Sequence, residues 1–321
     1  MNNEHYPFRK LLTVFTAFLL CFSVCSCNKT SDNEIPQEEE IIIPENEILS
    51  DPRVSYLGPA GTYTEEASQF FFPDAKEMIP MTTVSEAIEE MEKGNADYAV
   101  IPQENTLGGA VTNYVDTLIA DNKVFVVGEV ILPISQTLMG IEGTTLEDIK
   151  TVCSHAQGLS QSVEWRKQNL PDAETVEMSS TAAAAQYVAE RQDKSIAAIA
   201  APGAAPLYGL QVLAENVQIT DANKTRFYVL SDKKLENEGY QRAVFVVSCE
   251  ASLFDDVIVK IHDTGLELVG VHDRPEGSAL GTYNYIIEVE DLNGIKSTQI
   301  DEVCTMEEVR YLGSFNMMEK N

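Results

Sequence analysis

The amino-acid sequence predicts an α/β protein with two folded parts, and three observations support this prediction. From Arg53 onward, short β-rich runs alternate with helical patterns, which is typical of an α/β domain with mainly parallel strands. After Asp232 the pattern changes, and a polar connector at 233–240 precedes another α/β unit. That unit has the order strand, helix, two strands, helix, strand, which is a ferredoxin-like (βαββαβ) order.

The first 27 residues are predicted to be a targeting segment. Arg9 and Lys10 precede an apolar run at 11–24 that is too short to span a bilayer comfortably. The sequence VCSC at 24–27 resembles the lipobox of bacterial lipoproteins, in which Cys27 would be lipidated. We therefore expect export and a lipid anchor at Cys27, on the periplasmic face or the cell surface. A leader that does not function would leave the protein in the cytoplasm.

Residues 28–50 are predicted to be an acidic disordered linker, because they are rich in Glu, Asn, Asp and Ser and cannot bury enough surface to fold. The chain carries 22 basic and 51 acidic side chains, a net charge of −29. This charge repels a phosphate backbone, so nucleic-acid binding is not expected. An anionic substrate would need local positive potential from an arginine or from backbone N–H groups.

The folded part contains Cys153, Cys249 and Cys304, and none of them has the spacing of a metal or redox pair. A bridge between Cys249 and Cys304 stays open in an oxidising compartment. With four histidines and no paired histidine spacing, no metal site is expected.

The first folded part is predicted over 51–232. Its most definite helix opens at a capping box of Thr83 and Glu86 and is ended by Gly94. The other predicted elements are a strand at 54–57, a helix at 62–71, strands at 97–102 and 149–153, helices at 158–168 and 181–191, and a strand at 197–201.

Four polar or glycine-rich segments follow these strands, at 58–62, 103–109, 154–157 and 179–181. In open α/β sheets, ligands bind at the carboxyl ends of the strands. We therefore expect these segments to line one shared cleft.

The second folded part is predicted over 241–318. Its expected elements are a strand at 242–249, a helix at 252–264, strands at 266–271 and 283–290, a helix at 298–303 and a strand at 308–312.

Five motifs, in order between Val54 and Leu230, resemble those of the prephenate dehydratase family. They are GPAGTYT at 58–64, IPQENT at 101–106 with Gly109 and Val111, SHAQ at 154–157, STA at 180–182 with Ala184 and Ala185, and NKTRF at 223–227. Thr106 stands where the family has serine, and Ala156 where it has proline. The resemblance implies a two-lobed catalytic domain similar to type II periplasmic binding proteins.

Members of this family convert prephenate to phenylpyruvate by losing the ring hydroxyl and carbon dioxide together, and they need no cofactor. The resemblance implies that Thr225 is catalytic, as a hydrogen-bond or proton donor to the leaving hydroxyl. Arg226 would pair with a substrate carboxylate. The other residues implied to bind substrate are Thr62, Glu104, Asn105, Thr106, Ser154, His155, Gln157, Ser180, Thr181 and Phe227.

Each of these assignments has a structural alternative. Ser180 and Thr181 could act only as helix caps, and His155 could be bonded to backbone. Glu104 and Asn105 could hold their loop, and residues 225–227 could be strand residues with a buried ion pair.

The second folded part resembles an ACT domain. Arg274 and Pro275 retain half of the ESRP motif with which the family binds the effector phenylalanine, whereas His272 and Asp273 replace its Glu and Ser. These changes put inhibition by phenylalanine in question. A homodimer or a dimer of dimers, formed through paired ACT domains, remains expected.

Two other functions stay open at this point. One is an exported solute-binding lipoprotein, and the other is a catalytically impaired member of the family that binds a small carboxylate. Prephenate and arogenate are not distinguished as substrates by any residue.

Overall fold

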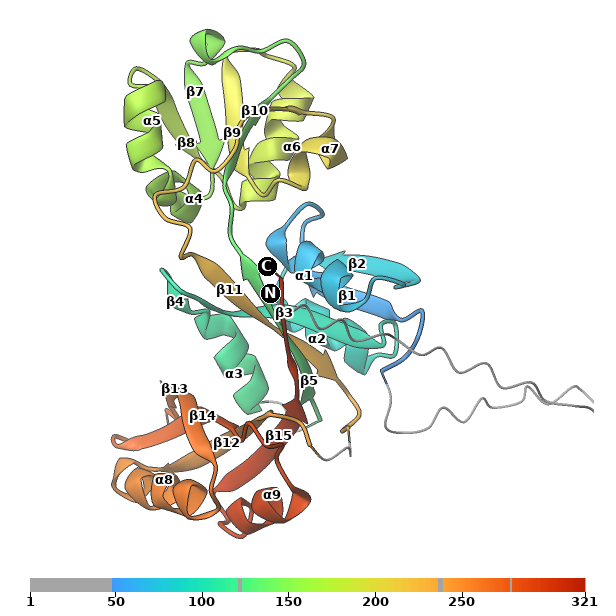
Figure 1. Ribbon diagram of the computed structural model, residues 1–321, viewed down its shortest axis with the longest axis vertical. Coiled ribbons are helices and arrows are strands. Elements are labelled where there is room, and N and C mark those ends of the chain that lie inside the picture. Colours follow the sequence, from blue (N-terminus) through green and yellow to red (C-terminus); the bar gives the residue numbers. More distant parts are fainter. Residues whose placement is uncertain (1–47, 121–122, 236–238, 278, 321) are drawn as a thin grey trace, which may run out of the picture. The chain divides into compact units, whose positions relative to one another are not determined.

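The structure, a computed structural model, describes residues 48–120, 123–235, 239–277 and 279–320. The predicted leader with Cys27 and nearly all of the linker therefore lie outside the described residues. The described strands form three sheets, which Figure 1 shows with their helices. In the part of the chain that is described, no helix combines the length and apolar character needed to cross a membrane.

The first sheet has the strand order β16-β5-β11-β3-β1-β2, with the short strand β4 paired to β3. Helix α1 (Tyr63–Phe71) covers one face, and helices α2 (Val84–Glu92) and α3 (Thr112–Ala120) cover the other. We call this sheet with its three helices the first lobe. Its strands are β1 (Arg53–Leu57), β2 (Glu77–Met81), β3 (Tyr98–Asn105), β4 (Gly109–Ala110), β5 (Phe125–Pro133), β11 (Lys224–Ser231) and β16 (Met317–Glu319).

The second sheet has the order β10-β6-β9-β7-β8 and forms the second lobe. Trp165 of α5 packs on one face with Val152 and Ile199, and α6 packs on the other face through Ala184 and Ala185. The elements are β6 (Thr137–Gly140), η1 (Leu146–Asp148), β7 (Thr151–Ser154), α4 (Ala156–Gln161), α5 (Val163–Asn169), β8 (Glu174–Glu177), α6 (Thr181–Arg191), β9 (Ile196–Ala200), α7 (Ala204–Tyr208) and β10 (Gln211–Ala214).

The chain crosses between the two lobes twice, at 134–136 and at 215–223. These crossing segments are hydrogen-bonded to each other, because Ile134 N donates to Asn223 O and Val217 N donates to Gln136 O, both at 2.9 Å. They therefore connect the lobes as a pair.

The prediction of mainly parallel strands is only partly right. β1 pairs in parallel with β2 and β3, and β7 pairs in parallel with β8 and β9. However, β11 is antiparallel to β3 and β5, and β6 is antiparallel to β9 and β10. A chain that crosses to another sheet and returns runs in the opposite direction on its way back, so the crossing strands pair antiparallel.

The third sheet has the order β13-β14-β12-β15, and all its pairs are antiparallel. The order strand, helix, strand, strand, helix, strand is the one that the sequence predicts. One face packs on α8 and α9, whereas the other places Val244, Val246 and Leu312 in the core with α2 and α3 of the first lobe. The elements are β12 (Arg242–Glu250), η2 (Ala251–Leu253), α8 (Phe254–Asp263), β13 (Glu267–Pro275), β14 (Thr282–Glu290), α9 (Ser297–Val303) and β15 (Val309–Phe315).

After the third sheet the chain returns to the first lobe. Strand β16 pairs in parallel with β5, and Lys320 Nζ lies 2.8 Å from Glu66 Oε1 of α1. The sequence places the end of the second folded part at 318 and does not predict this strand. Three residues are too few to show the alternation that identifies a strand.

Of two helix predictions made from local sequence signals, one is confirmed and the other is wrong. The capping box is confirmed, because Thr83 Oγ1 accepts from Glu86 N at 3.1 Å and Glu86 Oε2 accepts from Thr83 N at 3.2 Å. The single helix predicted at 158–168 is wrong, since α4 and α5 meet at Ser162. The Ser162 hydroxyl donates to Gly158 O at 2.7 Å, beside the Ser162 N–H, which donates to the same oxygen at 3.1 Å. Such a hydroxyl bond to the preceding turn often bends a helix.

The three described cysteines, Cys153, Cys249 and Cys304, are free thiols. The bridge between Cys249 and Cys304 that the sequence leaves open is therefore not formed in this structure.

Candidate functional site

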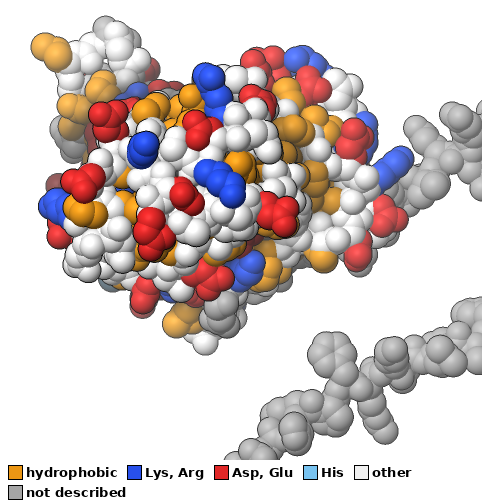
Figure 2. Space-filling view, turned by 90° about the horizontal axis from the view of Figure 1, so that it is seen from above, with side chains coloured by type: hydrophobic (Ala, Val, Ile, Leu, Met, Phe, Trp, Pro, Cys, Tyr) orange, Lys and Arg blue, Asp and Glu red, His pale blue; other side chains and the backbone are white. Residues whose placement is uncertain are grey.

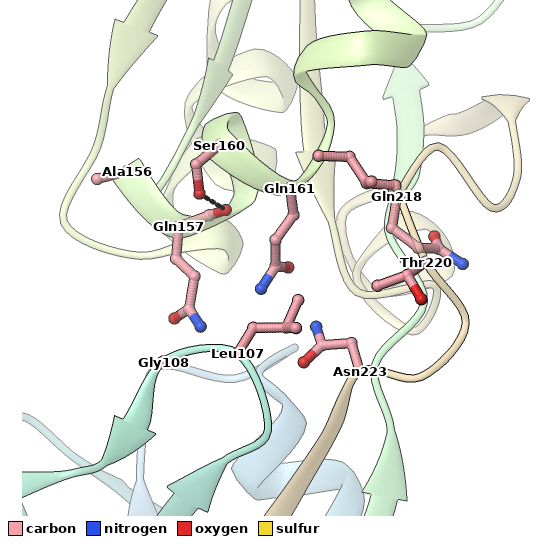
Figure 3. A pocket seen from close by; sticks show the side chains of 10 residues that line it. Leu107, Gly108, Ala156, Gln157, Ser160, Gln161, Gln218, Thr220 and Asn223 are labelled. Carbon is pink, nitrogen blue, oxygen red and sulfur yellow. Dashed lines mark hydrogen bonds between the residues drawn. The ribbon is translucent and has the colours of Figure 1, made fainter.

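A cavity of about 660 Å³ lies where the two lobes meet, next to the crossing segments. Its volume falls within the range of about 300–1,000 Å³ that is typical of small-molecule sites. The loop after β3, helix α4 and the second crossing segment supply its lining (Figure 3). The lining residues are Leu107, Gly108, Ala156, Gln157, Ser160, Gln161, Gln218, Ile219, Thr220 and Asn223.

Asn105, the last residue of β3, connects the three parts of this site. Its Oδ1 accepts from Leu107 N (3.1 Å), Gly108 N (2.9 Å) and Gln157 Nε2 (3.0 Å). Two of these donors are backbone N–H groups, which cannot act as acceptors, so they fix which end of the amide carries the oxygen. The Asn105 Nδ2 group is therefore directed at the opposite strand.

Thr225 lies opposite Asn105 in the sheet and receives that hydrogen bond. Asn105 Nδ2 donates to Thr225 Oγ1 at 2.9 Å and to Asn223 Oδ1 at 2.8 Å. Because the Thr225 oxygen acts as an acceptor here, its own hydroxyl proton is free to point elsewhere. Thr225 is 8% exposed and is not itself a lining residue, but its partner Asn105 is bonded to the lining residues Gly108, Gln157 and Asn223.

The cavity presents neutral donors. The Nδ2 group of the buried Asn223 has no hydrogen-bond partner among the described residues. Gln161 Oε1 accepts from Gln136 Nε2 at 3.0 Å, which leaves the Gln161 NH₂ group free to face the cavity. Figure 3 shows the amides of Gln157, Gln161 and Asn223 converging on the same space. In the described part of the chain, none of the lining side chains is charged.

Several residues predicted to bind substrate have local structural roles. Ser154 is buried and its hydroxyl donates to Ile199 O at 2.6 Å. His155 caps α4, where its Nδ1 accepts from Gln157 N, and Ser180 caps α6 by accepting from Ala183 N. The Thr106 hydroxyl donates to Lys224 O at 3.0 Å and ties the loop after β3 to β11.

Thr62 and Thr181 lie elsewhere. Thr62 caps α1 and lines a second cavity of about 650 Å³ with Pro202, Leu207 and Lys320. Thr181 begins α6, and a Cβ added to Gly158 would lie 3.4 Å from its Cγ2. Four segments were expected to line one shared cleft. Only two of them, 103–109 and 154–157, contribute residues to the lining of the first cavity.

Arg226 lines neither of these two cavities. Because successive side chains of a strand point to opposite faces of the sheet, Arg226 and Thr225 lie on different faces of β11. Its guanidinium bonds to three carboxylates, those of Glu129 (Nε to Oε1, 2.5 Å), Glu288 (Nη2 to Oε1, 2.5 Å) and Glu104 (Nη1 to Oε2, 3.4 Å). The interpretation of 225–227 as strand residues with a buried ion pair thus describes Arg226 in this structure. Phe227 is a core residue, 1% exposed, packed towards α1.

We call Arg226, Arg242, Glu104, Glu129, Glu288 and Glu290 the interdomain ion cluster, since it joins the first lobe to the third sheet. It contains four carboxylates and two guanidinium groups among the described residues. Glu129 is fully buried, and its Oε2 has no partner in the described part of the chain. Burial, together with the neighbouring Glu288 carboxylate, raises the pKa of Glu129 to about 7.

The residues at the position of the effector motif contact the first lobe of their own chain. The Tyr114 hydroxyl and His272 Nδ1 form a hydrogen bond, and Arg274 bonds to both oxygens of Asp116 at 2.5 and 2.7 Å. Tyr114 and Asp116 both belong to α3. Asp273 is exposed, and Pro275 is the last residue of β13.

Sequence reasoning missed Gln161, Asn223 and Glu288 as site or support residues. Asn223 lies inside the NKTRF motif and Gln161 follows SHAQ by four residues, so the motifs could have drawn attention to both. No local signal marks Glu288, because its role depends on contacts with residues 46 or more positions away.

On the face seen in Figure 2, Lys and Arg side chains stand singly among Asp and Glu side chains. No basic patch that could attract an anion is therefore seen on this face.

The two lobes, their paired crossing segments and the amide-lined cavity define a two-lobed α/β protein with a cavity of small-molecule size at the junction. A sequence profile of the family "Prephenate dehydratase" matches residues 54–235. The chain is 34% identical over 239 residues to the bifunctional chorismate mutase/prephenate dehydratase of Neisseria gonorrhoeae, which covers 74% of this chain and 66% of that protein. It is 30% identical over 273 residues to the prephenate dehydratase of Amycolatopsis methanolica, with 82% and 88% covered. The chain belongs to the prephenate dehydratase family.

A solved structure supports the same assignment. The prephenate dehydratase of Arthrobacter aurescens, in complex with L-Phe, matches with a TM-score of 0.74 at 30% identity, over 82% of this chain and 90% of that chain. The matched part spans 64–66% of the length of the bifunctional relatives, so those proteins contain a further part that this match does not include.

Proposed function

We propose that this protein is an active prephenate dehydratase whose hydroxyl donor is Thr225. Family membership supports the reaction, and the Asn105–Thr225 hydrogen bond is the observation that carries the assignment of the residue. In the reaction, the electrons of the bond to the departing carboxylate form the new ring double bond. The ring C–O bond breaks, and the hydroxyl leaves as water after it receives a proton.

The geometry gives Thr225 a defined role in that step. Asn105 occupies an acceptor position of the Thr225 oxygen, so the Thr225 proton is available to the leaving hydroxyl. Threonine is a weak acid, and its hydrogen bond helps most when it strengthens as negative charge develops on the leaving oxygen. Solvent then returns the proton to Thr225, and no cofactor takes part in the balance.

The substrate carboxylates would bind through neutral donors. The Asn223 Nδ2 group, which has no partner among the described residues, and the Gln161 NH₂ group face the cavity and could donate to a carboxylate bound there. Arg226 is held by three carboxylates, so its predicted role in binding a substrate carboxylate stays a prediction. Prephenate is the substrate that we propose, and arogenate remains the variant to test beside it.

The third sheet is proposed to be a divergent ACT-like domain that no longer binds phenylalanine. Its βαββαβ order and the retained Arg274 and Pro275 support the resemblance. Arg274 is paired with Asp116 and His272 with Tyr114 of the same chain, which leaves these side chains less available to an effector. The solved Arthrobacter structure is described as a complex with L-Phe, which makes phenylalanine the effector to test. A homodimer through this domain is part of the proposal.

We also propose export and lipid anchoring at Cys27, from the order of charged, apolar and cysteine residues at the N-terminus. A lipid-anchored enzyme would meet its substrate outside the compartment in which prephenate is made, so turnover has to be measured directly.

The experiment compares phenylpyruvate formation from prephenate by the wild type, Thr225→Val and Thr225→Ser. We expect Thr225→Val to lower kcat by about 10²–10⁴-fold, the usual size of a general-acid contribution, with a folded protein by circular dichroism. Thr225→Ser keeps the hydroxyl and should retain most of the activity. Added phenylalanine should leave the rate unchanged.

Two outcomes would contradict this proposal. A folded wild type that binds prephenate without converting it would support a solute-binding or impaired protein instead. Equal activity of Thr225→Val and the wild type would remove Thr225 from the mechanism while leaving the reaction in place.

A further inference from the structure

The carboxylate of Glu288 reaches from the third sheet into the two strands that carry the site. It is 3% exposed and accepts four hydrogen bonds. Oε1 accepts from Arg226 Nη2 (2.5 Å) and Arg242 Nη1 (2.9 Å), and Oε2 accepts from Tyr228 Oη (3.0 Å) and Gln103 Nε2 (3.2 Å). A buried carboxylate with this many donors is held in one position.

Three of these four donors surround an irregularity in the pairing of β3 with β11. Arg226 lies opposite Glu104, whereas Phe227 lies opposite Pro102, so Gln103 is an extra residue on β3. This is a β-bulge, a feature that re-aims side chains and occurs often beside active sites. Glu288 bonds to the extra residue itself and to Arg226 and Tyr228 on either side of Phe227.

The bulge decides which side chain meets Thr225. Beyond it, Phe227 pairs with Pro102 and Tyr228 with Ile101, and continuing that register would set Thr225 opposite Glu104. The observed shift sets Thr225 opposite Asn105 instead. An acceptor-only carboxylate would then replace the amide that donates to the Thr225 oxygen.

We propose that Glu288 is a positioning residue for catalysis, through which the third sheet holds the bulge at Gln103 and thereby the Asn105–Thr225 pair. Testing this role through kcat rests on the proposed dehydratase function, whereas the contacts of Glu288 with β3 and β11 do not depend on it. The residues that bond to the Glu288 carboxylate are not cavity-lining residues, so it acts through the strands and not on the substrate.

The test compares Glu288→Ala with Glu290→Ala in the full-length protein. Glu290 lies two residues further along β14, and its carboxylate pairs with Arg242 at 3.1 Å, but it makes no ion pair with β3 or β11. Both variants remove a carboxylate from the same strand and the same ion cluster. They differ in the bonds to the bulge, which makes Glu290→Ala the matched control.

We expect Glu288→Ala to lower kcat by about 10²-fold with little change in KM, as a small misplacement of a catalytic group does. Glu290→Ala should keep kcat near the wild-type value. Glu288→Gln retains an oxygen that can accept from the two arginines, so its kcat should lie between those of Glu288→Ala and Glu290→Ala. A role in stability alone would lower the melting temperature of both Ala variants without this split between kcat and KM.

Hydrogen–deuterium exchange provides a readout that does not depend on the reaction. Peptides that cover 98–109 and 222–231 should exchange faster in Glu288→Ala than in Glu290→Ala. If the wild type does not turn over prephenate, the proposed function fails and the exchange result still decides the role of Glu288.

If Glu288→Ala does not fold, the same measurements are made on Gln103→Met, which removes the hydrogen bond between the bulge residue and Glu288, with the same expected results. Wild-type kcat and unchanged exchange in the folded variant would overturn the proposal.

Discussion

Glu129→Gln should change how the stability of this protein depends on pH. Glu129 is fully buried beside Glu288, and its pKa is raised from 4.5 to about 7. The folded protein therefore holds a proton on Glu129 at pH values where the unfolded chain has released it. The groups that face Glu129 are Arg226, Tyr228, Arg242 and Glu288.

The magnitude follows from this difference in pKa. One pKa unit corresponds to about 1.4 kcal/mol, so ionising Glu129 within the folded protein costs about 3 kcal/mol. The folded pKa is the higher one, so this contribution to stability is present below the unfolded pKa and is lost as the pH rises through the folded pKa. Between about pH 5 and about pH 8, roughly 2–3 kcal/mol of it should disappear.

The glutamine introduced by this substitution would have the shape of the protonated carboxyl group and would not ionise. The unfolding free energy of Glu129→Gln, relative to the wild type, should therefore rise by roughly 2–3 kcal/mol over that pH interval. Urea denaturation followed by circular dichroism measures both proteins at each pH, and groups that titrate in both cancel in the difference. Glu267→Gln, which changes an exposed carboxylate, is the control and should give a flat difference.

A flat difference curve for Glu129→Gln would refute this reasoning, since it would mean that Glu129 is ionised in the folded protein throughout. A variant that loses stability relative to the wild type as the pH rises would show that the ionised carboxylate, bonded to Arg226, stabilises the fold.

Two further predictions concern the docking of the third sheet and the leader. Gly313→Ala should lower the free energy of unfolding by about 3 kcal/mol, because Gly313 has a φ of +144° and an added Cβ would collide with the backbone of Val126. Gly270→Ala, where no atom lies within 4 Å of the new Cβ, is the control; equal effects in urea denaturation would contradict this explanation. In cells, Cys27→Ala should move the protein from the membrane fraction to the soluble fraction, and an unchanged membrane fraction would argue against a lipid at Cys27.

Local interactions explain why part of the fold could be predicted. The capping box of Thr83 and Glu86 and the cap of α6 at Ser180 involve residues three positions apart, so their signals are complete within a short stretch of sequence. The order of motifs along the chain also pointed to the family, which the comparisons confirmed. By contrast, β16 depends on pairing with a distant edge strand, and nothing in its three residues indicates it.

The tertiary structure alone decided what adjacent motif residues do. Thr225 and Arg226 are neighbours in the sequence, but strand alternation sends Thr225 to Asn105 near the cavity and Arg226 to the interdomain ion cluster. The sequence determined which polar residues the site could use, and thereby the family. Which of them meet depends on a β-bulge, and on hydrogen bonds such as that between Gln103 and Glu288, which are 185 residues apart. Such a contact forms only when separate sheets pack, so no periodicity along the chain can reveal it.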